Sequence, residues 1–253
     1  MSLSYDWIGE FSYIQFPEIH EFDDDLITYG GELSPDFLLS AYSQGIFPWF
    51  SDDQPILWWS LDPRFVVFPE NLHVSKTMHK LLKKTSYTRT LDKAFPEVIR
   101  ACASAFRPDQ HGTWITSDMI DAYIKLHMLG FAHSAELWDG TTLVGGFYGV
   151  SLGNAFFGES MFSRVNDGSK LAFIPFVWLL QEEGFVFVDC QMETPHLKSM
   201  GGEEIPRKKY LTLLQRALEA PTRRGNWGSL YTNYPETDHW NRFFHADSLL
   251  RSE

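Results

Sequence analysis

The chain has 253 residues, of which 44% are apolar and 16% aromatic, enough for a sizeable core in one large domain or two small ones. Its formal net charge of −12 excludes a protein that coats nucleic acid with its whole surface, because phosphate affinity comes mainly from Lys and Arg. A local basic patch stays compatible with this charge, and the acidic balance itself fits either a cationic ligand or a contribution to solubility.

Residue types exclude further classes of protein. The chain has no apolar run long enough for a membrane span, and its N-terminus, with Asp6 and Glu10, lacks the basic region of a secretory signal. We therefore expect a cytoplasmic protein. Cys102 and Cys190 are the two cysteines, and neither has the spacing of a zinc site or a Cys-x-x-Cys motif. We expect both to be reduced thiols, and we expect no metal.

The N-terminal part of the chain combines one helix with an aromatic segment. Ser34 and Pro35 predict the start of a helix that ends at Gly45. Residues 46–59 then bring together Phe47, Phe50 and the tryptophans 49, 58 and 59 in turn-forming sequence. This segment is either a loop that its aromatic side chains fix to the core or a platform on which a base can stack.

A composition shift after Pro63 predicts a boundary between a small N-terminal domain, 1–63, and a larger domain, 64–253. Residues 74–84 predict a helix with an apolar stripe and a basic face. The cations on this helix and beside it are Arg64, Lys76, Lys80, Lys83, Lys84 and Arg89. They form either a solvated helix face or a phosphate-binding face. The five cations of the helix itself, Lys76, His79, Lys80, Lys83 and Lys84, have no acidic residue among them.

The remaining elements alternate in a recognisable order. Strands are expected at 87–90, 132–138, 142–152 and 155–162, and helices at 96–106 and 117–127. Asp139-Gly140 favours a hairpin, and Gly145-Gly146 marks a bulge or a close approach of two backbone segments. A helix at 170–183, capped by Ser169, a buried strand at 185–190 and a helix from Pro206 follow, and the tail after residue 220 is expected to be loosely held.

A meander of strands followed by a polar loop, a helix and a central strand is the order of a GNAT-like acyltransferase domain. We therefore predict an α+β protein whose larger domain has a mixed, mostly antiparallel sheet. In that fold the loop before the helix binds the pyrophosphate of CoA through a pattern with two small residues. The loop here, residues 164–170, lacks the second glycine, so we expect no CoA and no other cofactor.

Two carboxylates lie in or at the end of apolar strands, where a charge is costly unless it is paired or used. Asp189 could act as a general base, with Gln191 on the same face to orient or relay the proton. Alternatively, Asp189 is a structural carboxylate bonded to backbone N–H groups. Glu159 could hold a cationic ammonium group, or it could pair with a buried Arg.

Several apolar residues near these carboxylates belong either to the core or to the wall of a pocket for an apolar side chain. Such a pocket discriminates by about 1–3 kcal/mol for each methylene group. The residues are Phe147, Met161, Phe173, Phe176 and Val188.

Seven motifs, in order along the chain, resemble the leucyl/phenylalanyl-tRNA–protein transferase family of the bacterial N-end rule pathway. They are GIFPWF at 45–50, WWS and DPR within 58–64, HVSK at 73–76, GTWIT at 112–116, HSAE at 133–136, GESMFS at 158–163 and DCQ at 189–191. Seven ordered motifs are far more specific than a single glycine pattern.

The resemblance implies transfer of Leu or Phe, and less well Met, from aminoacyl-tRNA to the α-amine of proteins that begin with Arg or Lys. The new peptide bond would mark these proteins for degradation. The family has a small N-terminal domain of α/β type and a GNAT-like C-terminal domain, and it uses neither metal nor CoA. We expect a monomer.

The resemblance also implies roles for individual residues. Asp189 would assist deprotonation of the attacking amine with Gln191 as its partner, and Glu159 would position the aminoacyl group. Trp49 and Trp114 would hold the 3′-terminal adenosine, the five apolar residues would form the side-chain pocket, and the basic helix face would bind tRNA phosphates.

Two other functions fit the same sequence. One is an acyltransferase of this fold with another donor or acceptor, and the other is a tRNA-binding module without catalysis, in which Asp189 is structural.

Overall fold

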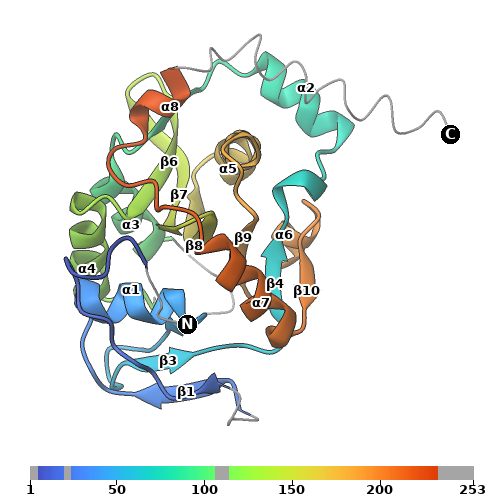
Figure 1. The fold of residues 1–253 in the computed structure, drawn as a ribbon. Coiled ribbons are helices and arrows are strands. Elements are labelled where there is room, and N and C mark those ends of the chain that lie inside the picture. The colour runs from blue at the N-terminus through green and yellow to red at the C-terminus, as the bar shows by residue number, and fades with distance from the viewer. Residues whose placement is uncertain (1–4, 20–23, 106–113, 233–253) are drawn as a thin grey trace, which may run out of the picture.

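The computed structural model describes residues 5–19, 24–105 and 114–232, and it contains two sheets (Figure 1). The smaller sheet is antiparallel, with the order β1 (Leu26–Tyr29), β3 (Leu57–Trp59), β2 (Phe47–Pro48). The aromatic segment therefore forms short strands rather than only a loop. Helix α1 (Pro35–Ser43) begins as predicted, because the Ser34 side chain accepts a hydrogen bond from Phe37 N at 3.4 Å.

The larger sheet has the order β10-β4-β9-β8-β7-β6-β5, in which β8 and β9 are parallel and every other neighbouring pair is antiparallel. This confirms the α+β class and the mixed, mostly antiparallel sheet. The strands are β4 (Arg64–Val67), β5 (Thr88–Leu91), β6 (Ala132–Asp139), β7 (Thr142–Leu152), β8 (Ala155–Ser163), β9 (Phe187–Gln191) and β10 (Glu203–Ile205).

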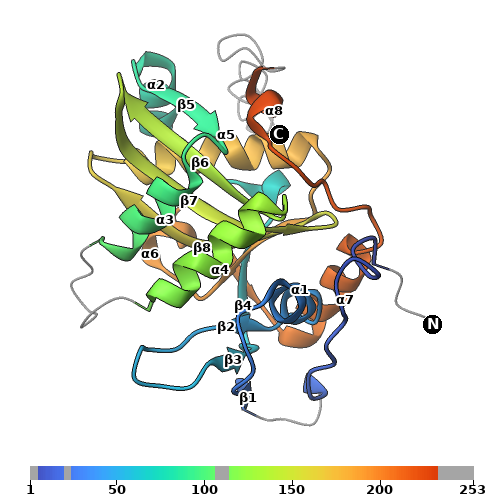
Figure 2. The same ribbon diagram turned by 90° about the vertical axis from the view of Figure 1, so that its left-hand side faces the viewer.

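Helices cover both faces of the larger sheet (Figure 2). Helix α5 lies on one face, while α3 and α4 lie on the other and α1 packs against α4. The remaining described helices are short or lie at the periphery. The helices are α2 (Lys76–Lys84), η2 (Pro69–Asn71), α3 (Phe95–Ala103), α4 (Ser117–Met128), α5 (Gly168–Glu182), α6 (Pro195–Lys198), α7 (Arg207–Ala217) and α8 (Gly228–Thr232).

The close approach predicted at Gly145-Gly146 is confirmed. A Cβ atom on Gly146 would lie 2.6 Å from the carbonyl oxygen of Ala135, and one on Gly145 would lie 3.0 Å from that of Gly168. The first distance leaves no room for a side chain, and the second is tighter than most contacts of a Cβ atom. Glycine at these positions therefore lets β7 approach both β6 and the start of α5.

Helix α5 begins earlier than predicted, because Asp167, in a left-handed conformation, and not Ser169, is its N-cap residue. Pro175 lies inside the helix and has no N–H for the carbonyl of Leu171. Arg89 from β5 supplies the missing donor, with its Nε 2.8 Å from that carbonyl oxygen. The helix therefore continues through the proline, and Arg89 has a structural role that the sequence did not indicate.

The tail after residue 220 was expected to be loosely held, and for residues 221–232 this expectation is wrong. Trp227 is 2% exposed and stacks on His133, with 3.8 Å between the ring centroids. The backbone N–H of Trp227 and Nδ1 of His133 both lie within hydrogen-bonding distance of Oδ2 of Asp92, at 2.7 and 2.9 Å. This buried cluster fixes the segment to the sheet.

One hydrophobic core includes residues from both sheets, among them Trp58 and Val66. Because the core is continuous across residues 63 and 64, it does not mark a domain boundary there, and that boundary stays a prediction. Within the described ranges, no helix is long and apolar enough to cross a membrane.

Candidate functional site

A pocket opens where strands β8 and β9 separate. The two strands pair from Ala155 and Phe187 up to Phe157 and Asp189, and β9 then continues beside β4 alone. Side chains from the unpaired ends of both strands therefore face a shared cavity of about 410 Å³. This separation is the structural reason that the GESMFS and DCQ motifs meet.

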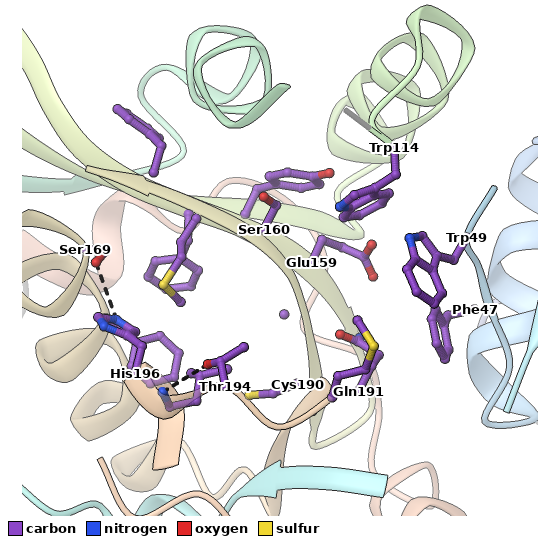
Figure 3. A pocket seen from close by; sticks show the side chains of 18 of the residues that line it. Phe47, Trp49, Trp114, Glu159, Ser160, Ser169, Cys190, Gln191, Thr194 and His196 are labelled. Atoms are coloured by element: carbon purple, nitrogen blue, oxygen red, sulfur yellow. Dashed lines mark hydrogen bonds between the residues drawn. The ribbon is translucent and has the colours of Figure 1, made fainter. Parts of the chain in front are cut away.

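The cavity is mainly apolar, with polar groups at opposite ends (Figure 3). Its lining comes from the small sheet, from β7 to β9, from the start of α5 and from α6. The lining residues are Phe47, Pro48, Trp49, Trp114, Phe147, Tyr148, Gly158, Glu159, Ser160, Met161, Phe162, Ser163, Ser169, Phe173, Cys190, Gln191, Met192, Thr194, His196 and Leu197.

Asp189 does not line this cavity. Its carboxylate is fully buried and accepts two hydrogen bonds from Arg64, from Nε at 2.8 Å and from Nη2 at 2.7 Å. The hydroxyl of Tyr210 donates a further bond at 2.7 Å. The structure therefore revises the expected direct role of Asp189 in deprotonation, since the carboxylate faces its partners in the core rather than a substrate.

Arg64 requires a correction of the same kind. Its side chain is fully buried between the rings of Phe47 and Tyr210, at 4.7 and 4.6 Å from their centroids, and its charge is paired with Asp189. A phosphate of tRNA cannot reach it. Arg64 was predicted to bind tRNA because it lies near the basic helix along the chain. In the structure its side chain points into the core instead.

Gln191 connects the buried pair to the cavity. Its backbone N–H donates to Asp189 Oδ1 at 3.0 Å, and its backbone has a φ of 57°, a left-handed conformation that is uncommon for a side chain of this kind. The side chain is 8% exposed and lines the cavity, and within the described part of the chain its Nε2 atom has no hydrogen-bond partner. A buried donor that faces a cavity without a protein partner can bind a ligand or a water molecule.

Glu159 is partly exposed to the cavity and is held by two tyrosines. The hydroxyl of Tyr42, from α1, donates to Oε1 at 2.6 Å, and that of Tyr123, from α4, donates to Oε2 at 3.2 Å. Burial raises the pKa of Glu159 to about 7, although these hydrogen bonds oppose the increase. The sequence did not indicate either tyrosine, because both lie far from Glu159 along the chain.

Three of the five predicted pocket residues form the apolar wall of the cavity, namely Phe147, Met161 and Phe173. The other two do not reach it. Phe176 is buried behind Phe147, with 5.0 Å between the ring centroids, and Val188 is fully buried in the same core. Phe176 lies one turn beyond Phe173 along α5, and Val188 lies in the part of β9 that still pairs with β8 through Phe156. Both predictions are therefore corrected, because the cavity begins only where the two strands separate.

Trp49 and Trp114 lie at one end of the cavity near the Glu159 carboxylate, and Phe47 lies beside Trp49 (Figure 3). Both indole rings are partly exposed. The rest of the GTWIT motif before Trp114 lies outside the described residues. Two partly exposed rings at the mouth of a pocket are suited to hold a planar group, and their assignment to adenosine stays a prediction.

At the other end, Ser169 lies near His196, with 3.4 Å between Oγ and Nε2. Burial lowers the pKa of His196, which favours the neutral imidazole. Burial also raises the pKa of the Cys190 thiol, as expected for a reduced cysteine that is not a nucleophile. Nothing in the sequence indicated that Ser169, Thr194 or His196 line the pocket, since each lies in the pattern of an ordinary helix start.

The predicted basic helix is α2, capped by Ser75, and its four lysines at 76, 80, 83 and 84 are exposed. On its apolar side Met78 and Leu82 belong to the same core cluster as residues of α5, and His79 stacks on Trp178 of that helix. Arg89 is partly buried against the Leu171 carbonyl, so it is not an open part of this face. The lysines face solvent, and their contact with phosphates stays a prediction.

Two family models together match most of the chain. The model described as leucyl/phenylalanyl-tRNA protein transferase matches residues 66–215, and the model for the N-terminal domain of the same proteins matches residues 31–62.

The leucyl/phenylalanyl-tRNA–protein transferase of an Anaeromyxobacter species is 53% identical over 211 residues, which is 83% of this chain and 89% of that protein. The protein of the same name from Maridesulfovibrio salexigens is 51% identical over 221 residues, or 87% of this chain and 92% of its own length. A GCN5-related N-acetyltransferase-like protein from Streptococcus suis is a distant structural match, with 11% identity and a TM-score of 0.31, covering 67% of this chain and 63% of that one. The sequence matches are decisive, and they show that the chain belongs to the leucyl/phenylalanyl-tRNA–protein transferase family.

Proposed function

We propose that the protein transfers Leu or Phe, and less well Met, from aminoacyl-tRNA to the N-terminal α-amine of proteins that begin with Arg or Lys, in the cytoplasm and as a monomer. The product carries a new N-terminal residue that would mark it for degradation. The observation that carries this proposal is a cavity that combines an apolar wall with the partly exposed Glu159 and with Nε2 of Gln191, which has no hydrogen-bond partner among the described residues.

The cavity accounts for the donor. Phe147, Met161 and Phe173 offer an apolar wall for a branched or aromatic side chain, and the aminoacyl ester would then lie near Glu159 and Gln191. Trp49 and Trp114 would hold the terminal adenosine at the mouth. In this arrangement the side chain is selected by apolar contact, and the tRNA is held by its end and its phosphates.

The reaction is aminolysis of an activated ester, so the protein has to align the amine with the ester, stabilise the developing oxyanion and accept one proton. We assign oxyanion stabilisation to Gln191, because its Nε2 donor lines the cavity without a partner among the described residues. Asp189 is then a positioning residue that acts through the backbone of Gln191. Because the ester is already activated, no cofactor is required.

Transfer of labelled leucine from Leu-tRNA to a model peptide tests the proposal. We expect transfer to a peptide that begins with Arg and none to the same peptide with N-terminal Ala, in the absence of CoA and added metal. Binding of Leu-tRNA by the folded protein without transfer to either peptide would contradict the proposal and favour a tRNA-binding module.

Reversal of charge on α2 tests its role in tRNA binding. Each phosphate contact contributes roughly 0.7 to 0.9 to the slope of log affinity against log salt. Lys80→Glu combined with Lys83→Glu should therefore weaken tRNA binding and reduce this slope by about 2, as measured by salt titrations. A matched control is Lys208→Glu on α7, an exposed lysine at the opposite end of the molecule (Figures 1 and 2), which should leave the slope unchanged. An unchanged slope in the double variant would exclude α2 from the tRNA site.

A further inference from the structure

The carboxylate of Glu159 and the hydroxyls of Tyr42 and Tyr123 form a closed ring of hydrogen-bonding contacts. Tyr42 contacts Oε1, Tyr123 contacts Oε2, and the two hydroxyl oxygens also contact each other. The members come from β8, α1 and α4, so three separate elements converge on this ring. Both tyrosine side chains are fully buried, whereas Glu159 is partly exposed to the cavity.

The ring has one contact more than it has protons when Glu159 is ionised. The three contacts then share only the two hydroxyl hydrogens, since a carboxylate only accepts hydrogen bonds. A third hydrogen on the carboxyl group completes the ring. In that form the carboxyl O–H donates to Tyr123, Tyr123 donates to Tyr42, and Tyr42 donates to Oε1. The geometry therefore accommodates one additional proton without moving a heavy atom.

Access also distinguishes the two carboxylates of the site. Glu159 lines the cavity in which the aminoacyl ester would lie, whereas Asp189 is enclosed by Arg64 and Tyr210 and does not line it. A group that takes a proton from a bound amine must be within hydrogen-bonding reach of that amine. Glu159 faces the cavity in which such an amine would bind, and Asp189 does not.

We propose that the ring of Glu159, Tyr42 and Tyr123 accepts the proton that the attacking α-ammonium group loses, with Glu159 as the catalytic base and the two tyrosines as its positioning residues. This inference rests on the proposed transfer reaction and replaces Asp189 in the role of base. It adds two residues, one of them from the N-terminal part of the chain, to the reaction site.

The step balances as follows for an acceptor that arrives as an ammonium group. Its first proton moves to Glu159, and the free electron pair of nitrogen forms a bond to the ester carbonyl carbon. The bond between that carbon and the ribose oxygen then breaks, and its electron pair stays on the ribose oxygen. The second amine proton ends on this oxygen, and Glu159 later releases the first proton to water.

The ionisation of Glu159 is suited to this role. Burial raises its pKa to about 7, while the hydroxyls of Tyr42 and Tyr123 lower it in part. The other charged groups that act on it are Asp189 of β9, which raises the pKa, and Arg64 of β4, which lowers it. A base with a pKa near neutrality is largely ionised at pH 7.5 and can still receive a proton from an α-ammonium group of pKa about 7.7–8.0.

The test is the pH dependence of single-turnover transfer from saturating Leu-tRNA to the peptide with N-terminal Arg, corrected for spontaneous loss of the ester. The wild-type rate should rise through pH 7. In Glu159→Gln this step should vanish and the rate near pH 7 should fall by about 10²–10⁴. The difference in rate between Glu159→Gln and the wild type should become smaller above pH 9, where the amine is already neutral. A variant profile parallel to that of the wild type would overturn the proposal and leave Glu159 a binding role.

Tyr42→Phe and Tyr123→Phe test the positioning role. Each removes a hydrogen bond that stabilises the carboxylate, so the rise in rate should move to higher pH, whereas a merely structural effect would lower the rate equally at every pH. The control is Tyr29→Phe, whose residue is 73% exposed and should show the wild-type profile. Thermal unfolding verifies that each variant is folded. Unshifted profiles in both variants would overturn the role of the tyrosines.

Failure of this inference is distinguishable from failure of the proposed function. Transfer by the wild type with an unaltered pH step in Glu159→Gln would overturn the inference alone. Absence of transfer by the wild type would overturn both. The difference in carboxyl infrared absorption between wild type and Glu159→Gln adds a readout without substrate, and absence of a titrating band near pH 7 would also overturn the inference.

Discussion

Replacement of Arg64 by methionine is expected to lower the free energy of unfolding by about 3–5 kcal/mol. The reason is that the fully buried carboxylate of Asp189 would lose the guanidinium that donates two of its hydrogen bonds. The hydroxyl of Tyr210 and the N–H of Gln191 would remain, but neither carries a charge. Denaturant unfolding measures the loss.

The double variant Arg64→Met with Asp189→Leu separates the unpaired charge from the loss of packing. It leaves no unpaired charge at this position, and replacing both members of a buried ion pair by apolar residues is often close to neutral. We expect it to recover most of the stability that either single variant loses. A double variant as unstable as the sum of the single variants would show that the pair itself, rather than the uncompensated charge, provides the stability.

The same double variant should be slow in transfer although it is folded. The backbone N–H of Gln191 donates to Asp189 Oδ1, and a leucine cannot accept that bond. The left-handed backbone at Gln191 would then lose the contact that fixes it. Stability and activity would thus be separated in one protein, as expected if Asp189 positions Gln191.

Local signals predicted the elements well. The Asp139-Gly140 hairpin, the glycine pair of β7 and the cap of α1 were all evident, because each depends on neighbours along the chain. The ordered packing of residues 221–232 was not evident from the sequence. Trp227 is buried through contacts with His133 and Asp92, which lie far away along the chain. Nothing in the composition of the segment indicates those contacts.

The site shows the same division. Glu159 and Gln191 could be chosen as candidates, because a polar residue in an apolar strand is unusual. The partners of the carboxylates Asp189 and Glu159 could not be chosen, since Arg64 lies 125 residues from Asp189 and Tyr42 lies 117 residues from Glu159. Which carboxylate faces the cavity depends on where β8 and β9 separate, and the strand pattern alone does not fix that point.

Replacement of Gln191 by glutamate is expected to reduce the rate of transfer by about 10²–10³, the cost of removing one oxyanion donor. Glutamate has nearly the same shape, but at neutral pH its carboxylate has no hydrogen to donate. Binding of Leu-tRNA should change much less than the rate, because the oxyanion develops only in the transition state. Single-turnover rates and equilibrium binding on the same preparations separate the two effects.

The direction of this effect decides between two roles for Gln191. If the side chain accepted a proton from the amine, glutamate would be a far stronger base and the rate would rise or stay the same. If Nε2 donates to the ester oxygen, glutamate removes the donor and adds a negative charge beside the developing oxyanion. The matched control is Gln191→Asn, which keeps the amide on a shorter side chain and should retain part of the activity. A Gln191→Glu enzyme that is faster than the wild type would therefore contradict the oxyanion role. A slow Gln191→Glu enzyme together with a partly active Gln191→Asn enzyme would be explained by the loss of the hydrogen-bond donor alone.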